Sequence, residues 1–210
     1  MKPRTILAIL LLTITQACNS GGGKKGTDSP GIADFDDAKT IRHKSPDGSF
    51  AINIPEGWKL DRQQKVGSWL TLISSSEEAW LTIINSENHK AAELKIYVFK
   101  QQPMGNVPAD IKDRFLLGLA EPFFNGWLAG LKEQARVERA SKAYRTKIDG
   151  SDAIRMDVGY YRGDGHDPRS GYVATVLGEH TGFYISLVGD EAGVRALERI
   201  MLSFKIEPDK

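Results

Sequence analysis

The residues that could do chemistry gather most densely in residues 162–169, which read Arg-Gly-Asp-Gly-His-Asp-Pro-Arg. Asp164, His166 and Asp167 place two carboxylates and an imidazole close together, and these are groups that bind divalent cations. The EF-hand pattern is missing, because there are no regularly spaced Asp or Asn ligands and no closing Glu. Gly, Asp and Pro are also what a tight hairpin turn requires. We expect a turn, and keep a metal-dependent enzyme or binder as an alternative.

The sequence contains no other recognisable catalytic or cofactor motif. It lacks a Gly-x-Ser-x-Gly nucleophile elbow, zinc-type histidine spacing, and a Gly-x-Gly-x-x-Gly segment opening a helix. Lys and Arg number 28 against 27 Asp and Glu, so no strongly basic field is present to bind nucleic acid phosphates. We therefore expect a protein that is not an enzyme, needs no cofactor and does not bind nucleic acid.

Tryptophan offers a second kind of site, because aromatic side chains can line a groove for a glycan or a peptide. Trp69, Trp80 and Trp127 occur within strand-like or helix-like segments, where a large aromatic side chain is more often part of the core. Trp58 follows Pro-Glu-Gly and is expected at a rim. It is the candidate residue for binding a partner.

The first residues have the composition of an export signal. Lys2 and Arg4 precede an apolar run over Ile6–Ile14, which is too short to span a bilayer. We therefore interpret residues 1–17 as a signal peptide.

The only cysteine, Cys18, directly follows Ala17 and this apolar run, and its position resembles the processing site of bacterial lipoproteins. The resemblance implies cleavage before Cys18, a diacylglyceryl thioether on its sulfur and an acylated new N-terminus, which together anchor a protein stably to a membrane. Asn19 in the next position implies the outer membrane, facing the periplasm, if the host is Gram-negative. A secreted protein with an unused thiol is the alternative.

Residues 18–42 are rich in Gly, Ser, Lys and Asp, and are expected to form a flexible tether with a reach of about 25 Å. Residues 43–210 are expected to form one domain. Alternation of apolar residues predicts strands at Phe50–Ile54, Trp69–Ser74, Trp80–Ser86 and Leu94–Phe99. Several of these segments are apolar on both faces, which predicts a sheet that is covered on both sides.

Two amphipathic helices could supply this cover. One begins near Asn106–Pro108, presents Ile111, Phe115, Leu116 and Leu119, and is expected to break or kink at Pro122 before Phe123 starts a second apolar stripe. The other begins after Asp190, a natural N-cap residue, and ends near Phe204.

Further strands lie between the two helices. Val137–Lys147 is polar and typical of an edge strand, and Asp149-Gly150 is a hairpin turn signal before Ala153–Tyr161. Tyr172–Leu177 and Phe183–Val188 are expected to form another hairpin, with Glu179 in its turn, at the end of the sheet opposite to residues 162–169. Short turns join antiparallel neighbours, so we expect an α+β fold, a sandwich around an antiparallel sheet.

Phe50-Ala-Ile-Asn-Ile-Pro followed by Gly57-Trp58, together with the terminal Phe183–Val188 strand and a helix ending in Ser-Phe-Lys-Ile at residues 203–206, resembles the PsbP/DcrB-like superfamily. The resemblance implies an α/β/α sandwich, with helices covering a central antiparallel sheet, and a role without catalysis, in line with the small envelope lipoproteins and photosystem accessory subunits of the superfamily. We therefore expect a membrane-anchored envelope lipoprotein that serves as an accessory or binding module of an envelope protein complex. A small-ligand carrier is a further alternative.

Overall fold

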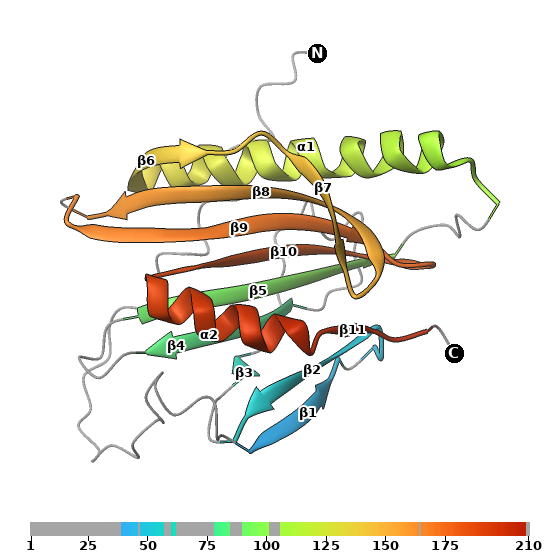
Figure 1. Cartoon of the computed structure of the whole chain (residues 1–210), viewed down its shortest axis with the longest axis horizontal. Helices are drawn as coiled ribbons and strands as arrows, with labels where there is room; N and C mark the ends of the chain where they lie inside the picture. The colour runs from blue at the N-terminus through green and yellow to red at the C-terminus, as the bar shows by residue number, and fades with distance from the viewer. Residues whose placement is uncertain are drawn as a thin grey trace, which may run out of the picture.

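The computed structural model describes residues 39–45, 47–56, 60–61, 78–84, 90–100, 106–163 and 165–208 (Figure 1). The strands are β1 (Thr40–Lys44), β2 (Phe50–Pro55), β3 (Leu60–Asp61), β4 (Glu78–Ile84), β5 (Lys90–Lys100), β6 (Ala135–Ala140), β7 (Tyr144–Ile148), β8 (Ser151–Arg162), β9 (Asp167–Leu177), β10 (Thr181–Gly189) and β11 (Lys205–Ile206), and the helices are α1 (Ala109–Gln134) and α2 (Glu191–Leu202). The strand expected at Trp69–Ser74 lies outside the described residues.

One large antiparallel sheet forms the centre of the fold. Its strand order is β3-β4-β5-β10-β9-β8-β6, and β7 also pairs with β8. A smaller sheet has the order β1-β2-β11, which the sequence did not predict. The α+β class expected from the sequence is confirmed.

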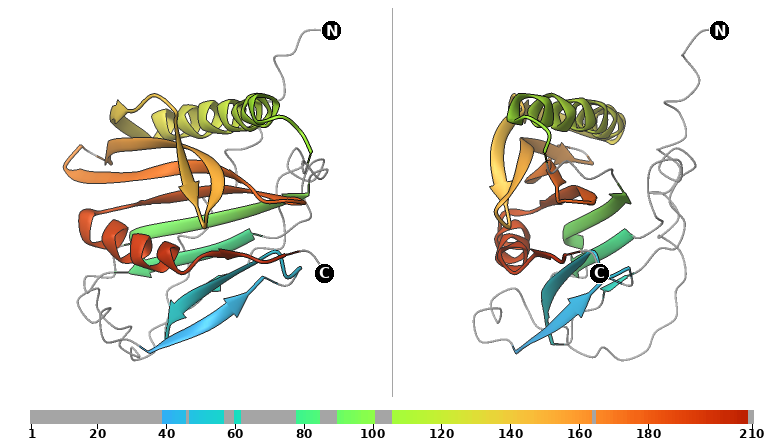
Figure 2. Two further views of the ribbon diagram at one scale, coloured as in Figure 1. Left: turned by 45° about the vertical axis from the view of Figure 1, so that its right-hand side comes forward. Right: turned by 90° about the vertical axis from the view of Figure 1, so that its right-hand side faces the viewer.

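The two helices cover opposite faces of the large sheet. Ile154 of β8 lies in a buried cluster with Leu116 of α1, whereas its neighbour Ala153 lies in the cluster that contains Leu197 of α2. Since successive residues of a strand point to opposite faces, the sheet separates the two helices. In Figure 2, α1 (green) and α2 (red) lie apart, with strands of the large sheet between them. The expected sandwich is confirmed.

Helix α2 has a local signal at its start and a buried face along its length. The Asp190 carboxylate accepts a hydrogen bond from the backbone N–H of Gly193 at 2.7 Å, as expected of an N-cap. Its buried side includes Leu197 and Ile200. Beyond the end of the helix, Phe204 packs edge to face against Phe183, with ring centroids 5.4 Å apart. Phe50 joins the same aromatic cluster and ties the small sheet to the large one.

Of the break or kink expected at Pro122, the break does not occur, and that part of the prediction was wrong. Helix α1 runs without interruption through Pro122, which is exposed, as is Gly118 one turn earlier. A proline in a helix removes one hydrogen bond to the preceding turn and crowds that turn's carbonyl. Here the affected carbonyl is that of Gly118, which faces solvent, so water can satisfy it.

The apolar residues of the first half of α1 are only partly used for packing. Leu116 is buried, but Ile111 and Phe115 remain 45% and 41% exposed, in contrast to the expectation that they share one covered stripe. The buried face of α1 instead centres on Leu116, Ala120, Phe123 and Phe124.

The polar edge strand expected at Val137–Lys147 is divided into β6 and β7, which both pair with β8. Between them, the Ser141 hydroxyl accepts a hydrogen bond from the backbone N–H of Asp157 at 3.0 Å, in place of a strand carbonyl. The Asp149-Gly150 turn between β7 and β8 is confirmed, with positive φ angles of 50° and 77°.

Candidate functional site

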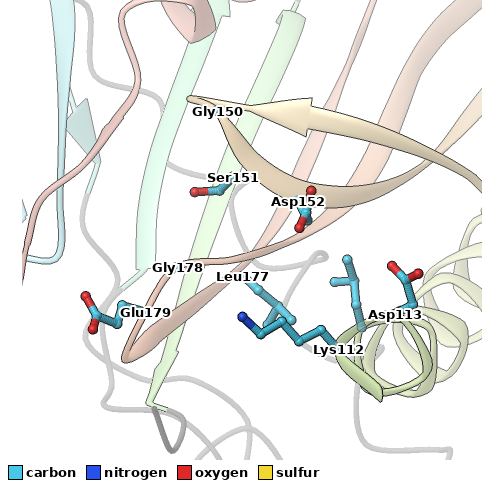
Figure 3. A pocket seen from close by; sticks show the side chains of 9 residues that line it. Lys112, Asp113, Gly150, Ser151, Asp152, Leu177, Gly178 and Glu179 are labelled. Carbon is cyan, nitrogen blue, oxygen red and sulfur yellow. The ribbon is translucent and has the colours of Figure 1, made fainter. Parts of the chain in front are cut away.

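A cavity of about 280 Å³ lies where three segments distant in the sequence meet, and it is the candidate site. Figure 3 shows the start of α1, the turn between β7 and β8, and the turn between β9 and β10 around it. Its lining residues are Lys112, Asp113, Leu116, Gly150, Ser151, Asp152, Leu177, Gly178 and Glu179.

The topology brings these segments together. Strand β8 begins directly after the Asp149-Gly150 turn, and β9 ends directly before Gly178. Because β8 and β9 are antiparallel neighbours, both turns lie at the same end of the sheet. The backbone N–H of Gly178 donates to the Thr181 carbonyl at 2.8 Å, which closes the second turn.

Ion pairs compensate two of the carboxylates in the cavity. Asp113 of α1 lies 2.7 Å from the Arg145 guanidinium of β7, and Asp152 lies 3.0 Å from the Lys147 ammonium. The Asp113–Arg145 pair also connects the helix to the edge of the sheet. These carboxylates are consequently held by neighbouring cations.

The chemistry of the lining is that of a mixed-charge recognition surface. Lys112 supplies a cation, Glu179 an anion and Ser151 a hydroxyl, while Leu116 and Leu177 supply apolar surface. Neither histidine nor cysteine occurs among the lining residues, and within the described ranges no three His, Cys, Asp or Glu side chains are grouped so as to hold a metal. The arrangement suits contact with a polar peptide or protein segment. Its place between helix and sheet is where the carrier alternative put a pocket, and that alternative stays a prediction.

The metal candidate from the sequence lies at the opposite end of the sheet, in the turn between β8 and β9. His166 is exposed, and the Asp167 carboxylate accepts a hydrogen bond at 2.6 Å from Arg169, whose side chain is 9% exposed. Asp164 lies outside the described residues, so the trio as a whole stays a prediction. The expectation that Glu179 and residues 162–169 occupy opposite ends is confirmed by the β8–β9–β10 pairing.

The other sequence candidates divide into two groups. Cys18, Trp58 and Trp69 lie outside the described residues. Trp127 is partly buried and packs against the cluster beneath α1, as expected of a core residue.

A second polar cluster lies on the α2 side of β8, and its contacts are structural. Arg155 donates to the Asp157 carboxylate at 2.7 Å, and the Tyr144 hydroxyl donates to the same carboxylate at 2.8 Å. Burial and this hydrogen bond raise the pKa of Tyr144 above its usual value. Burial alone would lower the pKa of Arg155, but Asp157 more than offsets this and raises it. Arg155 therefore stays charged and Tyr144 keeps its proton at neutral pH, and their hydrogen bonds to Asp157 fix the edge of the sheet.

Sequence reasoning missed the cavity as a site, although it identified both of its turns. The signal that could have found it is the pairing of β8 with β9. When these two strands pair antiparallel, the turn before β8 and the turn after β9 lie at the same end of the sheet. The contribution of Lys112 and Asp113 depends on where α1 crosses the sheet, for which the sequence contains no local signal.

Comparison with known proteins gives a resemblance in fold. No protein-family profile matches the chain, and no curated protein sequence does. Among solved structures, the chain is similar to cyanobacterial PsbP (CyanoP) from Synechocystis sp. PCC 6803, with 12% identity over 90% of this chain and 98% of that one, at a TM-score of 0.45.

Two further structures are similar at the same level. LpqN of Mycobacterium tuberculosis, described as involved in cell envelope biogenesis, is 15% identical over 86% of this chain and 99% of that one, at a TM-score of 0.46. A Bacteroides thetaiotaomicron structure is 14% identical over 80% of this chain, at a TM-score of 0.47, and this chain spans about half of it (48%).

Proposed function

We propose that the protein is a non-enzymatic binding or accessory module of the cell envelope, held at a membrane by acyl chains on Cys18. The anchoring part is supported by the signal-like residues 1–17 and the position of the only cysteine. Of α1 and α2, neither is both long enough and apolar enough to cross a bilayer.

The binding part is carried by one observation, the combination of exposed apolar and charged side chains at the start of α1. Ile111 and Phe115 are one turn apart on the helix, so their side chains are neighbours on its surface, and both are about half exposed. Between them in the sequence, Lys112 and Asp113 line the cavity. An apolar centre with a charged rim is the usual anatomy of a protein interface.

The mechanism is one of local concentration. A lipid anchor confines the domain near membrane-bound partners, and the expected tether, which ends where β1 begins at Thr40, determines how far the domain reaches. Specificity then comes from the surface that meets the partner, and no chemical step on a substrate is needed.

Two experiments test the two parts separately. For the anchor, Cys18→Ser or globomycin treatment is expected to leave an unprocessed precursor and to change how the protein fractionates; unchanged processing and fractionation would contradict anchoring.

For the binding surface, a photo-crosslinking amino acid replaces Phe115 in living cells, and Leu202 of α2, which is 83% exposed, serves as the matched control. We expect a discrete adduct with an envelope protein from position 115 that position 202 does not give. No adduct at 115, or the same adducts at both positions, contradicts the interface.

A further inference from the structure

Two arginines of β6 are seated side by side on β8, at the end of the sheet away from the cavity. Arg136 is opposite Tyr161, and its guanidinium carbon lies 4.8 Å from the centre of the Tyr161 ring. Arg139 is opposite Gly159, and a Cβ at Gly159 would come within 2.9 Å of the Arg139 Nε and 3.0 Å of its Cγ. The missing side chain of Gly159 therefore gives Arg139 the space it occupies.

A β-bulge places both arginines on the same face of the sheet. Residues 136 and 139 are three apart, so a regular strand would direct their side chains to opposite faces. The register of β6 shifts between Val137 and Arg139, and the extra residue restores a common face. A glycine inside a strand weakens it, and Gly159 is such a residue. A bulge, a glycine and an aromatic ring thus act together to hold two guanidinium groups on one face.

The fold does not neutralise these two cations. Within the described residues, neither Arg136 nor Arg139 forms an ion pair, whereas Arg114 and Arg195 each bind a carboxylate one turn away. The nearest charged carboxylate along β8, Asp157, already accepts hydrogen bonds from Arg155 and Tyr144. Glu138, on the bulge itself, is exposed and forms no ion pair in the described part of the chain either.

Both arginines are also exposed on the α2 side of the sheet. Helix α2 packs on β2, β5, β9 and β10, while β6 and the end of β8 lie beyond it (Figure 1). Charged residues on an edge strand deter unwanted pairing, but either sign of charge serves that purpose. Protection of the edge therefore does not explain why two arginines lack acidic partners among the described residues. Nor does it explain why Gly159 and Tyr161 lie where they hold the two guanidinium groups in place.

The spacing of the pair indicates its ligand. Gly159 and Tyr161 are two residues apart on one strand, so the groups seated on them are about 7 Å apart along the strand. The same distance separates side chains at alternate positions of an extended peptide. Carboxylates at such positions could each meet one guanidinium, and arginine binds carboxylates in a planar, two-pronged geometry.

We propose that Arg136 and Arg139 form a binding site for an extended acidic segment of a partner protein, with Asp or Glu at alternate positions. The Tyr161 ring holds the Arg136 guanidinium, and Gly159 lets Arg139 lie along the sheet, so both donors are positioned before the partner arrives. The proposal deepens the proposed function by naming the chemistry of a partner, and rests on it only for the existence of that partner. Binding in solution does not depend on acylation of Cys18.

The test uses the full chain purified in a neutral detergent and a fluorescent peptide of alternating Glu and Thr, with binding followed by anisotropy at low salt. We expect the double variant R136Q/R139Q to weaken binding about tenfold, since two charge-assisted contacts are lost. The matched control R114Q/R195Q removes the same charge elsewhere and should stay within about twofold. G159A keeps both charges but displaces Arg139, and should weaken binding about threefold while the chain remains folded by circular dichroism.

Three outcomes would overturn the proposal. The site and control double variants could weaken binding equally, which would mean a general charge effect. A Gln-Thr peptide could bind as well as the Glu-Thr peptide. Mixed micelles containing phosphatidylglycerol could compete for the arginines better than the peptide does, which would mean a lipid surface. Failure of any of these binding assays leaves the Cys18 and Phe115 experiments unaffected, so the two proposals fail separately.

Discussion

The guanidinium of Arg155 lies over the ring of Tyr172, with its carbon 3.8 Å from the ring centre. The same side chain contacts Asp157 at 2.7 Å and Glu198 of α2 at 3.8 Å. One residue of β8 therefore connects its own strand, the neighbouring strand β9 and the helix that covers them.

We expect Arg155→Ala to lower the free energy of unfolding by about 1–2 kcal/mol, because it removes a largely desolvated cation–π contact and a charge-assisted hydrogen bond. Arg195→Ala is the control: this arginine pairs with Glu191 one turn away along α2 and is 65% exposed, so its loss should cost less than about 0.5 kcal/mol. Urea unfolding of the full chain measures both. Equal losses would mean that the Arg155 cluster adds nothing beyond a surface ion pair.

Alkaline pH should destabilise the fold through two tyrosines. Burial raises the pKa of Tyr172 and Tyr184 to about 12, from an ordinary value of 10.0. The unfolded chain therefore loses these protons first, so the contribution is complete below pH 10 and is lost as the pH rises towards 12. Urea midpoints should fall between these values, and Tyr184→Phe should reduce the fall. A midpoint independent of pH over this range would contradict the assignment.

Acid should destabilise the turn between β1 and β2, because Asp47 becomes protonated there. Burial alone would raise the pKa of Asp47, but hydrogen bonds from Ser49 and Ser45 outweigh it and lower the pKa below 3.8. The stabilisation is therefore complete above the ordinary pKa and is lost as the pH falls through the lowered one. Asp47→Ala should cost about 1 kcal/mol at pH 7, and the difference from the parent chain should shrink at about pH 3. Ser45→Ala, which removes one donor, should show a smaller difference with the same pH trend.

Two glycines should respond to alanine in opposite directions. Gly171 has a φ of 151°, and a Cβ there would lie 2.0 Å from the Leu187 carbonyl oxygen, so Gly171→Ala should cost at least about 3 kcal/mol. Gly118 is helical, and a Cβ there would meet nothing within 4 Å, so Gly118→Ala should stabilise by about 0.5–1 kcal/mol. Thermal unfolding of the two variants compares them directly. A destabilised Gly118→Ala chain would show that this face of α1 is covered in the protein.

Local signals in the sequence predicted the elements whose cause is local. The Asp190 cap, the Asp149-Gly150 turn and the hairpin of β9 and β10 each depend on a few adjacent residues, and the structure confirms them. The continuity of α1 through Pro122 depends instead on which side of the helix faces solvent. That is a property of the packed molecule, so the sequence pattern predicted a break.

The small sheet and the functional surfaces depend on long-range pairing. Strand β11 pairs with β2 across most of the chain, and the boundary expected at residue 43 falls within β1 of that sheet. The seating of Arg139 on Gly159 depends on a one-residue shift in register, which no sequence pattern marks. The composition of residues 162–169 predicted a candidate site there. The cavity is formed instead by turns whose residues match no catalytic or binding motif.

The division of the outer strand into β6 and β7 also affects how the molecule behaves among its own copies. A second chain that tried to add a strand here would meet a short segment, a bulge, and then the Ser141–Ala143 interruption before the next short segment. Its backbone could not keep a continuous hydrogen-bonded register along this border, and the positive charges would repel an identical border. These features disfavour growth of the sheet by strand addition at this side, even when the protein is crowded.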